Sequence, residues 1–413
     1  AIHYASANGH TGVVKFLVDH RANINAIDKD NRTALHNASA HGRTEVVKVL
    51  VEGGARIHEI GMFMSSALHD ASANGHTEVV KFLVERGADF NTVCNDQRTA
   101  LHLASIEGCT GAVKLLIERG ADVNAIDKRS WTALHDASAN GHPEVVKALL
   151  EHGRDVNTID KPYKSALRDA SRKGLTYVRK RLIERGAEVN AVADNKRTAL
   201  HMASFNGHID VVRFLLEGGA DVSVIGITAL HDASATGHTA VVELLVRNSA
   251  DFNARGNNNR TTLHVASFNG HINVVRFLLE GSADVTAIDK DGDTALINAS
   301  AKSHTNIVKL LVERGADVNA RGIIGFNNQT ALHKASLGGH IEVIKFLLER
   351  GVDGSAIGMV DKDGDMALHY AVAKGHMNIV KLLVEHGADL NARGMFVGRF
   401  QIELSSYQHH RYQ

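Results

Sequence analysis

The sequence predicts an all-α solenoid of about twelve stacked helix-turn-helix repeats, and three observations support this prediction. The tetrapeptide Thr-Ala-Leu-His and its variants recur at a nearly fixed period. Each period contains two short segments whose apolar residues follow helical spacing and which end near a glycine. Neither segment exceeds about ten residues, a length at which an isolated helix is marginal in water, so neighbouring repeats have to supply the core.

The histidine of the tetrapeptide serves as an anchor for measuring the period. Successive anchors are separated by 33 residues six times, and then by 30, 33, 33, 36 and 36 residues. Two anchor positions hold arginine or isoleucine in place of histidine. The twelve anchors, which number the repeats, are His3, His36, His69, His102, His135, Arg168, His201, His231, His264, Ile297, His333 and His369.

The third repeat shows how each element follows from its residues. Its first helix is expected to begin after Ser66, a good N-cap residue, and to end at Gly75, with small alanines that allow close packing. Its second helix is expected over 77–86, where valine, phenylalanine and leucine form an apolar stripe. Gly87 is expected to terminate that helix, and a polar finger then leads to the next repeat.

These segments resemble the ankyrin repeat. The motifs Thr-Ala-Leu-His, Ala-Ser-x-x-Gly-His, Glu-Val-Val-Lys-x-Leu-Val-Glu and Gly-Ala-Asp-Val-Asn-Ala recur over nearly the whole chain. The resemblance implies stacked helix pairs, β-hairpin fingers at right angles to them, and a concave face made of fingers and first helices. Alanine stands where the family often has proline, which explains why the chain has only 2 prolines. We therefore expect a solenoid over 1–393, with a truncated first repeat, and a C-terminal cap or mobile tail over 394–413.

Composition excludes several classes of protein. Lys plus Arg and Asp plus Glu both number 46, so a chain that coats nucleic acid or anionic membrane over its whole surface is disfavoured. The 2 cysteines exclude a disulfide framework and suit a reducing compartment. No apolar run is long enough to span a bilayer, and no signal peptide is visible at the N-terminus. We expect an intracellular protein, cytoplasmic or nuclear.

The 26 histidines suggest a metal site or a pH sensor at first sight. Ten of them are anchors, and nine lie seven residues later in the Gly-His step. The resemblance implies that each anchor histidine bonds near the capping threonine and bridges adjacent turns. The remaining histidines have no ligand spacing, and we favour a solvated tail over a weak metal site at His409 and His410. One effect of pH is still expected. Acid should destabilise the stacked repeats, because partly buried neutral imidazoles would have to take up a proton.

No catalytic constellation is visible. The chain lacks a phosphate-binding glycine loop, His-Glu-x-x-His and a nucleophile elbow. A Cys94 or Cys109 nucleophile with His102 is conceivable, but an interchangeable small residue in a repeat slot is favoured. We interpret the acids that directly follow four anchors as a solvated stripe. These acids are Asp70, Asp136, Asp169 and Asp232. We therefore expect no enzyme, no cofactor and no metal site.

The sixth repeat departs most from the pattern. Between Lys161 and Arg185 nine basic residues accompany only two acids, a net charge of +7. One hypothesis is a pocket for an acidic or phosphorylated partner, formed by Arg172 and Lys173 beside Tyr163. The alternative, which we favour, is a solvated face balanced by nearby acids. Nucleic acid is an unlikely partner because few aromatic residues interleave with the basic ones.

Apolar departures mark further candidate contacts. The slot four residues after the anchor is mostly alanine, but four repeats carry a large apolar residue there, and Trp131 takes a fingertip place. Three other fingers carry apolar residues, at 62–64, 323–326 and 359–360, which would either contact a partner or fold back on a neighbouring finger. The candidate partner-binding residues are Phe205, Asn206, Phe268, Asn269, Ile106, Leu337, Trp131, Tyr163, Arg168, Arg172, Lys173, Asp136, Asp232 and Ile227.

The sequence therefore predicts a scaffold or adaptor that holds partner proteins on its concave face. An alternative is the recognition arm of a larger multidomain effector, which the missing initiator methionine and the truncated first repeat favour. Because terminal repeats normally need polar caps, the first helix pair could also mediate self-association. The residues 394–404 leave the repeat pattern and could form a makeshift cap.

Overall fold

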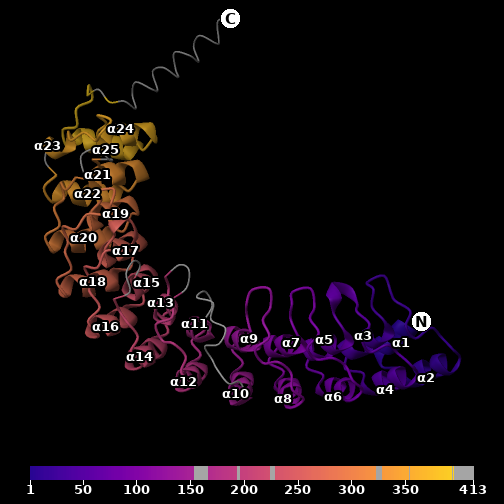
Figure 1. The fold of residues 1–413 in the computed structure, drawn as a ribbon. Coiled ribbons are helices and arrows are strands. Elements are labelled where there is room, and N and C mark those ends of the chain that lie inside the picture. The colour runs from indigo at the N-terminus through magenta and orange to yellow at the C-terminus, as the bar shows by residue number, and fades with distance from the viewer. Residues whose placement is uncertain are drawn as a thin grey trace, which may run out of the picture. The chain divides into compact units, whose positions relative to one another are not determined.

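A computed structural model describes residues 1–152, 166–192, 196–223, 228–321, 328–352, 354–392 and 394. Within these residues the helices follow one another in pairs, one pair per repeat (Figure 1). The first helices are α1 (Ile2–Asn8), α3 (Ala34–Ala40), α5 (Ala67–Ala73), α7 (Ala100–Ile106), α9 (Ala133–Asn140), α11 (Ala166–Arg172), α13 (Ala199–Phe205), α15 (Ala229–Thr236), α17 (Thr262–Asn269), α19 (Ala295–Ala301), α21 (Ala331–Gly338) and α24 (Ala367–Ala373).

The second helices carry the apolar stripe predicted for them. They are α2 (Thr11–Asp19), α4 (Thr44–Glu52), α6 (Thr77–Glu85), α8 (Thr110–Glu118), α10 (Pro143–His152), α12 (Thr176–Glu184), α14 (Ile209–Glu217), α16 (Thr239–Arg247), α18 (Ile272–Glu280), α20 (Thr305–Glu313), α22 (Ile341–Glu349) and α25 (Met377–Glu385). Short helices also occur within the fingers, at η1 (Met62–Met64), η2 (Asn257–Asn259) and α23 (Gly354–Ile357).

Stacking between repeats builds the core. The first helix α3 packs against α1 and α5, and the second helix α4 packs against α2 and α6. In the third repeat Leu68, Val79, Val80 and Leu83 are fully buried. Burying each such side chain stabilises the fold by roughly 1.5–3 kcal/mol, which short helices could not gain in isolation. The predicted helical solenoid is confirmed.

The helix ends follow the predicted signals. Ser66 accepts a hydrogen bond from the backbone N–H of His69, which begins α5. Gly75 and Gly87 both have positive φ, at 72° and 89°, just beyond α5 and α6. This left-handed conformation is easy for glycine and lets the chain reverse after each helix.

The chain divides into two compact units. The N-terminal unit comprises residues 1–203 and 217–220, and the C-terminal unit comprises residues 204–216 and 221–413. The predicted boundary between solenoid and tail stays a prediction, because residues 395–413 lie outside the described residues. Tyr163, Ile227 and the apolar finger residues at 323–326 also lie outside them.

The fingers end in tight turns rather than extended strands. The N–H of Asp127 donates to the carbonyl of Trp131 (2.8 Å), and Ser130, with φ 60°, closes the turn onto the Asp127 carbonyl. A β-turn followed by a left-handed residue is typical of a three-residue hairpin loop. The only β-bridges among the described residues join Ile60 to Ser66 and Ile288 to Thr294. The fingers are therefore short hairpin turns, and in the described residues two of them carry an antiparallel β-bridge.

Candidate functional site

The anchor histidines connect each repeat to the next. In His36 the Nδ1 atom accepts the backbone N–H of Thr33 (3.2 Å), so the ring proton lies on Nε2, which donates to the carbonyl of Ser65 (3.1 Å). The His36 imidazole is buried, and this burial lowers its pKa. Equivalent bonds run from His102 to Trp131 and from His231 to Arg260. The predicted bridging role is confirmed.

The Gly-His step forms a second connection, which the sequence reasoning counted but did not explain. The Nε2 atom of His76 lies 3.1 Å from the carbonyl of Ala40 in the preceding repeat. Its ring packs directly on Gly42, where an added Cβ would lie 2.5 Å from the imidazole. The pairing of glycine and histidine one repeat apart therefore reflects close contact between them.

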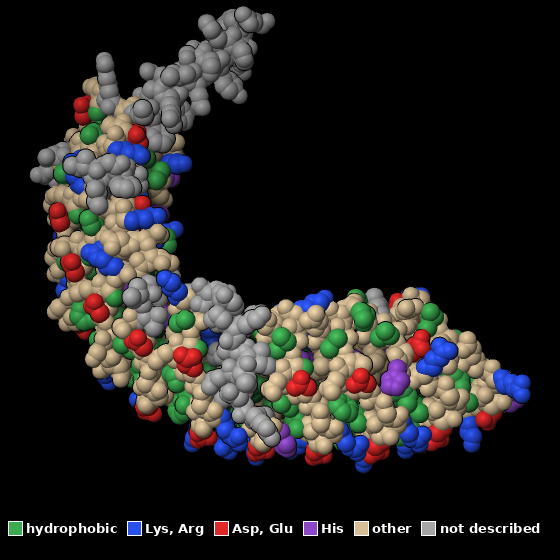
Figure 2. Space-filling view, in the orientation of Figure 1, with side chains coloured by type: hydrophobic (Ala, Val, Ile, Leu, Met, Phe, Trp, Pro, Cys, Tyr) green, Lys and Arg blue, Asp and Glu red, His purple; other side chains and the backbone are tan. Residues whose placement is uncertain are grey.

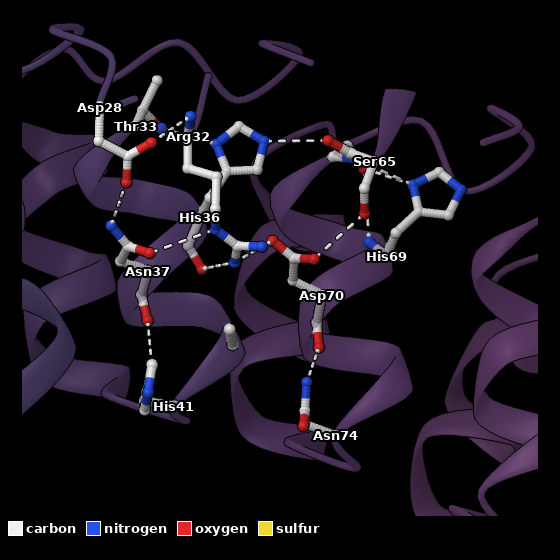
Figure 3. A network of polar contacts seen from close by, with 12 residues as sticks. Asp28, Arg32, Thr33, His36, Asn37, His41, Ser65, His69, Asp70 and Asn74 are labelled. Atoms are coloured by element: carbon white, nitrogen blue, oxygen red, sulfur yellow. Dashed lines mark hydrogen bonds and ion pairs between the residues drawn. The ribbon is translucent and has the colours of Figure 1, made fainter. Parts of the chain in front are cut away.

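A polar network lies at the base of the fingers (Figure 3). Asp28 accepts the backbone N–H groups of Asp30 and Arg32 and thereby shapes its own turn. Arg32 then reaches across the repeat boundary to Asp70, at 2.8 Å, and also donates to Asn37 (3.2 Å). The network therefore links a finger to the first helices of two repeats.

The same arrangement recurs where the fourth and fifth repeats meet. Arg98 approaches Asp127 (3.4 Å) and Asp136 (3.8 Å), and Arg129 contacts the same two carboxylates at 3.0 and 3.2 Å. Burial raises the pKa of Asp136 to about 6 despite both guanidinium groups. Burial opposes ionisation of Asp127 too, but hydrogen bonds from Trp131 and Arg129 hold its pKa below the ordinary value.

The prediction of a solvated acidic stripe is wrong. Asp136 is only 1% exposed, Asp169 and Asp232 are also buried, and Asp70 is half-buried. Cations lie beside three of these carboxylates: Arg32 contacts Asp70, Arg98 and Arg129 contact Asp136, and Arg172 lies near Asp169. Asp136 and Asp232 therefore lie beneath the finger face, the surface formed by the fingers and first helices.

Trp131 lies just after the fingertip rather than at it. Residues 128–130 form the turn, and Trp131 is half-buried on the returning limb. The Arg129 guanidinium lies 4.2 Å from the centre of its ring, and the His135 ring stacks at 6.3 Å. Trp131 is therefore part of the finger face, held by a cation–π contact.

The apolar slots lie at the C-terminal ends of first helices. Phe205 is 40% exposed, whereas Phe268, Ile106 and Leu337 are half-buried. The carbonyl groups of Ile106 and Phe268 accept bonds from Gly-His histidines, which hold these ends in place. Asn206 and Asn269 follow the phenylalanines and are exposed. These side chains lie at or just beyond the ends of the first helices, in the slots that the repeat assigns to them.

The sixth repeat is less basic at its surface than its sequence suggests. Arg179 is fully buried in α12, at the position that Val80 occupies in the third repeat. Arg172 lies 3.7 Å from Asp169, while Lys173 is exposed and Arg168 is half-buried. Arg181, which is also in α12, contacts Glu184 and Tyr177 on the same helix. The count of +7 therefore overstates the charge available on the finger face.

A row of exposed aliphatic side chains lies on successive fingers, and it was not predicted from the sequence. Ile27, Ile60, Val93 and Ile126 are between 41% and 54% exposed. They lie nine residues before successive anchors, so their period of 33 residues was the signal that could have found them. We call them the finger row.

A pocket of about 240 Å³ opens within the finger row. Ile60 and Met64 from one finger and Val93 from the next line it, together with His58 and Asp89. Phe63, at the tip of the same finger, is 65% exposed. Figure 2 shows hydrophobic side chains at intervals along the N-terminal unit. Exposed apolar side chains around a pocket are typical of binding surfaces.

Other candidate chemistry finds little support among the described residues. They contain no group of three or more His, Cys, Asp and Glu side chains arranged to hold a metal. Cys109 takes the place of a Gly-His histidine against Gly75, and burial raises the pKa of its thiol, which disfavours the thiolate. No helix in the described ranges is long and apolar enough to cross a membrane.

Comparison with known proteins agrees with this architecture. Models described as ankyrin repeats match residues 2–51, 68–160, 167–256, 249–322 and 321–394. The crystal structure of the human ASB11 ankyrin repeat domain is similar at 28% sequence identity, over 49% of this chain and 92% of that chain, with a TM-score of 0.46. No curated protein matches the chain.

Proposed function

Because the chain belongs to the ankyrin-repeat family, whose repeats are generally protein-interaction modules, we propose that it is a scaffold or adaptor that binds partner proteins through its finger face. The finger row is the observation that carries this proposal. Four aliphatic side chains, one per finger, are exposed at a regular interval, and two of them, Ile60 and Val93, line a pocket. Burying them against a partner would gain about 25 cal/mol for each Å² of apolar surface removed from water.

The buried network supports the same proposal. Bonds such as Arg32 to Asp70 and His36 to Ser65 order the finger bases before any partner arrives. A surface ordered in advance loses less conformational entropy on binding, which favours affinity. The acids and histidines of the network thus act as supports for the finger face and need not touch the partner.

Capture from a cell lysate with matched variants tests the proposal. The bait Ile60→Asp/Val93→Asp introduces charge into the finger row, and Lys81→Glu/Lys114→Glu changes charge on the second helices of the same repeats. We expect mass spectrometry to find proteins retained by the wild type and by the second-helix control but lost from the finger variant. Equal retention on all three baits would contradict binding through the fingers.

An acidic or phosphorylated partner at the sixth repeat is a narrower proposal. Its support is the exposed Lys173 and the partly exposed Arg172 at the end of α11. Guanidinium and ammonium groups suit carboxylate and phosphate ligands. The burial of Arg179 removes that guanidinium from the candidate site.

Self-association through the first repeat is a further narrow proposal. Val13 is 52% exposed, whereas the corresponding Val79 of the third repeat is fully buried between neighbouring helices. Phe16 and Tyr4 are exposed on the same helix pair. Sedimentation of the wild type and of Val13→Glu at several concentrations tests this proposal, and a monomer at every concentration for both proteins would contradict it.

A further inference from the structure

Lysines occupy the finger face of the last repeats in places where the first five repeats carry no lysine or arginine. In repeats nine to twelve no acid occupies the slots one, four or five residues after the anchor. Lys334 directly follows the anchor of the eleventh repeat. Lys302 and Lys374 lie five residues after the anchors of the tenth and twelfth repeats. Figure 2 shows Lys and Arg side chains following one another along the edge of the C-terminal unit where Figure 1 places the first helices.

The solvent-facing charges of this region are mainly positive. Lys302 and Lys374 are exposed, and within the described ranges neither forms an ion pair. The neighbouring finger acids Asp289 and Asp361 are buried, and each accepts two backbone N–H groups of its own turn. These two acids therefore shape the fingers. The tip acids Asp291, half-buried, and Asp363, exposed, each follow an exposed lysine in the sequence.

Apolar surface lies between these cations. The Lys302 Nζ atom is 4.6 Å from the centre of the Phe268 ring, and the Arg260 guanidinium is 5.5 Å from it. Leu337 is half-buried one repeat beyond Lys302, on the same helix as Lys334. Lys334 is partly neutralised by Asp293, at 3.5 Å. The result is a strip in which charged and apolar contacts alternate.

We propose that this lysine strip, formed by Lys302, Lys334 and Lys374 with Phe268 and Leu337, binds an acidic peptide segment of a partner protein, with apolar side chains between its carboxylates. The proposal rests on the proposed function, because it names the chemistry of a partner on the same finger face. Charge complementarity would steer such a segment to the strip and fix its register.

A peptide fits the strip better than a nucleic acid. Single-stranded nucleic acids need open aromatic rings on which bases stack. Lys302 and Arg260 lie over the Phe268 ring, in the place that a stacked base would take, and Tyr370 is buried with its hydroxyl bonded to Asp361. Among the described residues of the strip no aromatic ring is therefore open for stacking.

Fluorescence anisotropy with defined probes tests the strip on the full chain. The probes are a labelled peptide of glutamate and leucine, the same peptide with lysine in place of glutamate, and a labelled oligothymidylate. The variant Lys302→Glu/Lys374→Glu removes the strip charge, and Lys309→Glu/Lys381→Glu makes the same change on the second helices of the same two repeats. Lys302→Arg/Lys374→Arg keeps the charge. Circular dichroism checks that all variants fold.

We expect the wild type, the second-helix control and the arginine variant to bind the acidic peptide equally, and the strip variant to bind it about tenfold more weakly or worse. Added salt should weaken binding, because the lysines are exposed. The proposal is overturned if the acidic peptide does not bind, if the control loses as much affinity as the strip variant, or if the oligonucleotide binds more tightly. Any of these failures leaves the finger-row capture experiment intact, so the two proposals fail separately.

Discussion

The Nε2–H of His333 donates a hydrogen bond to the backbone carbonyl of Asp365, in the next repeat, across 3.2 Å. The tautomer follows from Nδ1, which accepts the backbone N–H of Thr330 (3.2 Å). One neutral imidazole therefore satisfies a helix N-terminus and a finger of the following repeat together. Repeated along the chain, this bond makes the stack depend on histidines that remain uncharged.

Acid should weaken the stack through these histidines. Burial lowers the pKa of His333 from 6.5 to about 4, so the unfolded chain takes up the proton first as the pH falls. The contribution of His333 is present above 6.5 and is lost as the pH falls towards 4. Between about pH 8 and about pH 5, we expect the wild type to lose about 2 kcal/mol more unfolding free energy than His333→Gln.

Urea denaturation at the two pH values measures this difference. The comparison with His333→Gln is needed because the raised pKa of Asp136 acts in the opposite direction. Equal pH dependence in the two proteins would show that His333 is not buried in its neutral form.

Removing Arg32 should destabilise the junction between the second and third repeats. Its guanidinium is the cation beside Asp70, whose pKa is raised by burial. We expect Arg32→Ala to cost about 1–3 kcal/mol, and Arg32→Ala/Asp70→Ala to cost less than the sum of the single changes. A double-mutant cycle by urea denaturation measures the coupling. Lys48→Ala, which breaks an exposed pair with Glu45, is the control and should cost less than about 0.5 kcal/mol. Additive effects at Arg32 and Asp70 would argue against a stabilising bridge.

Adding a methyl group at Gly42 should disrupt the Gly-His contact. A Cβ there would meet the His76 ring at 2.5 Å, and the residue has φ of 66°. Gly54→Ala is a matched control, because its φ is also positive, at 97°, but its surroundings are open. We expect Gly42→Ala to cost about 1–3 kcal/mol more than Gly54→Ala in thermal or urea unfolding. The addition of His76→Ala should remove part of that excess, and an unchanged excess would exclude the ring contact as its cause.

Charge reversal in the sixth repeat should separate its two interpretations. If Arg172 and Lys173 hold an acidic partner, Arg172→Glu/Lys173→Glu should abolish its capture. Lys180→Glu/Arg185→Glu makes the same change in charge on α12 and just beyond it, and should leave capture intact. Capture that survives the first change would support a solvated face. Capture lost equally with both variants would indicate a general effect of charge.

Much of the fold could be predicted because its signals are local. Ser66, Gly75 and Gly87 mark helix ends through backbone chemistry that needs no distant partner. The finger row is equally visible in the sequence as a period of 33 residues, but it belongs to the regular repeat and not to the departures from it. The candidate contacts Phe205 and Phe268 are departures from the repeat, because most repeats carry alanine in their slot.

The sequence by itself determined the repeat, its helix pairs and the places where side chains change, because a strict period assigns each residue to a slot. The tertiary structure alone decided which of those slots are open to solvent. The stack buries the charged side chains of Asp136 and Arg179. The side chains of Lys302 and Ile60, which also belong to the repeats and their fingers, are exposed. The reason is that burial in a solenoid depends on the neighbouring repeat, whose finger or helix covers one side chain and leaves the next free.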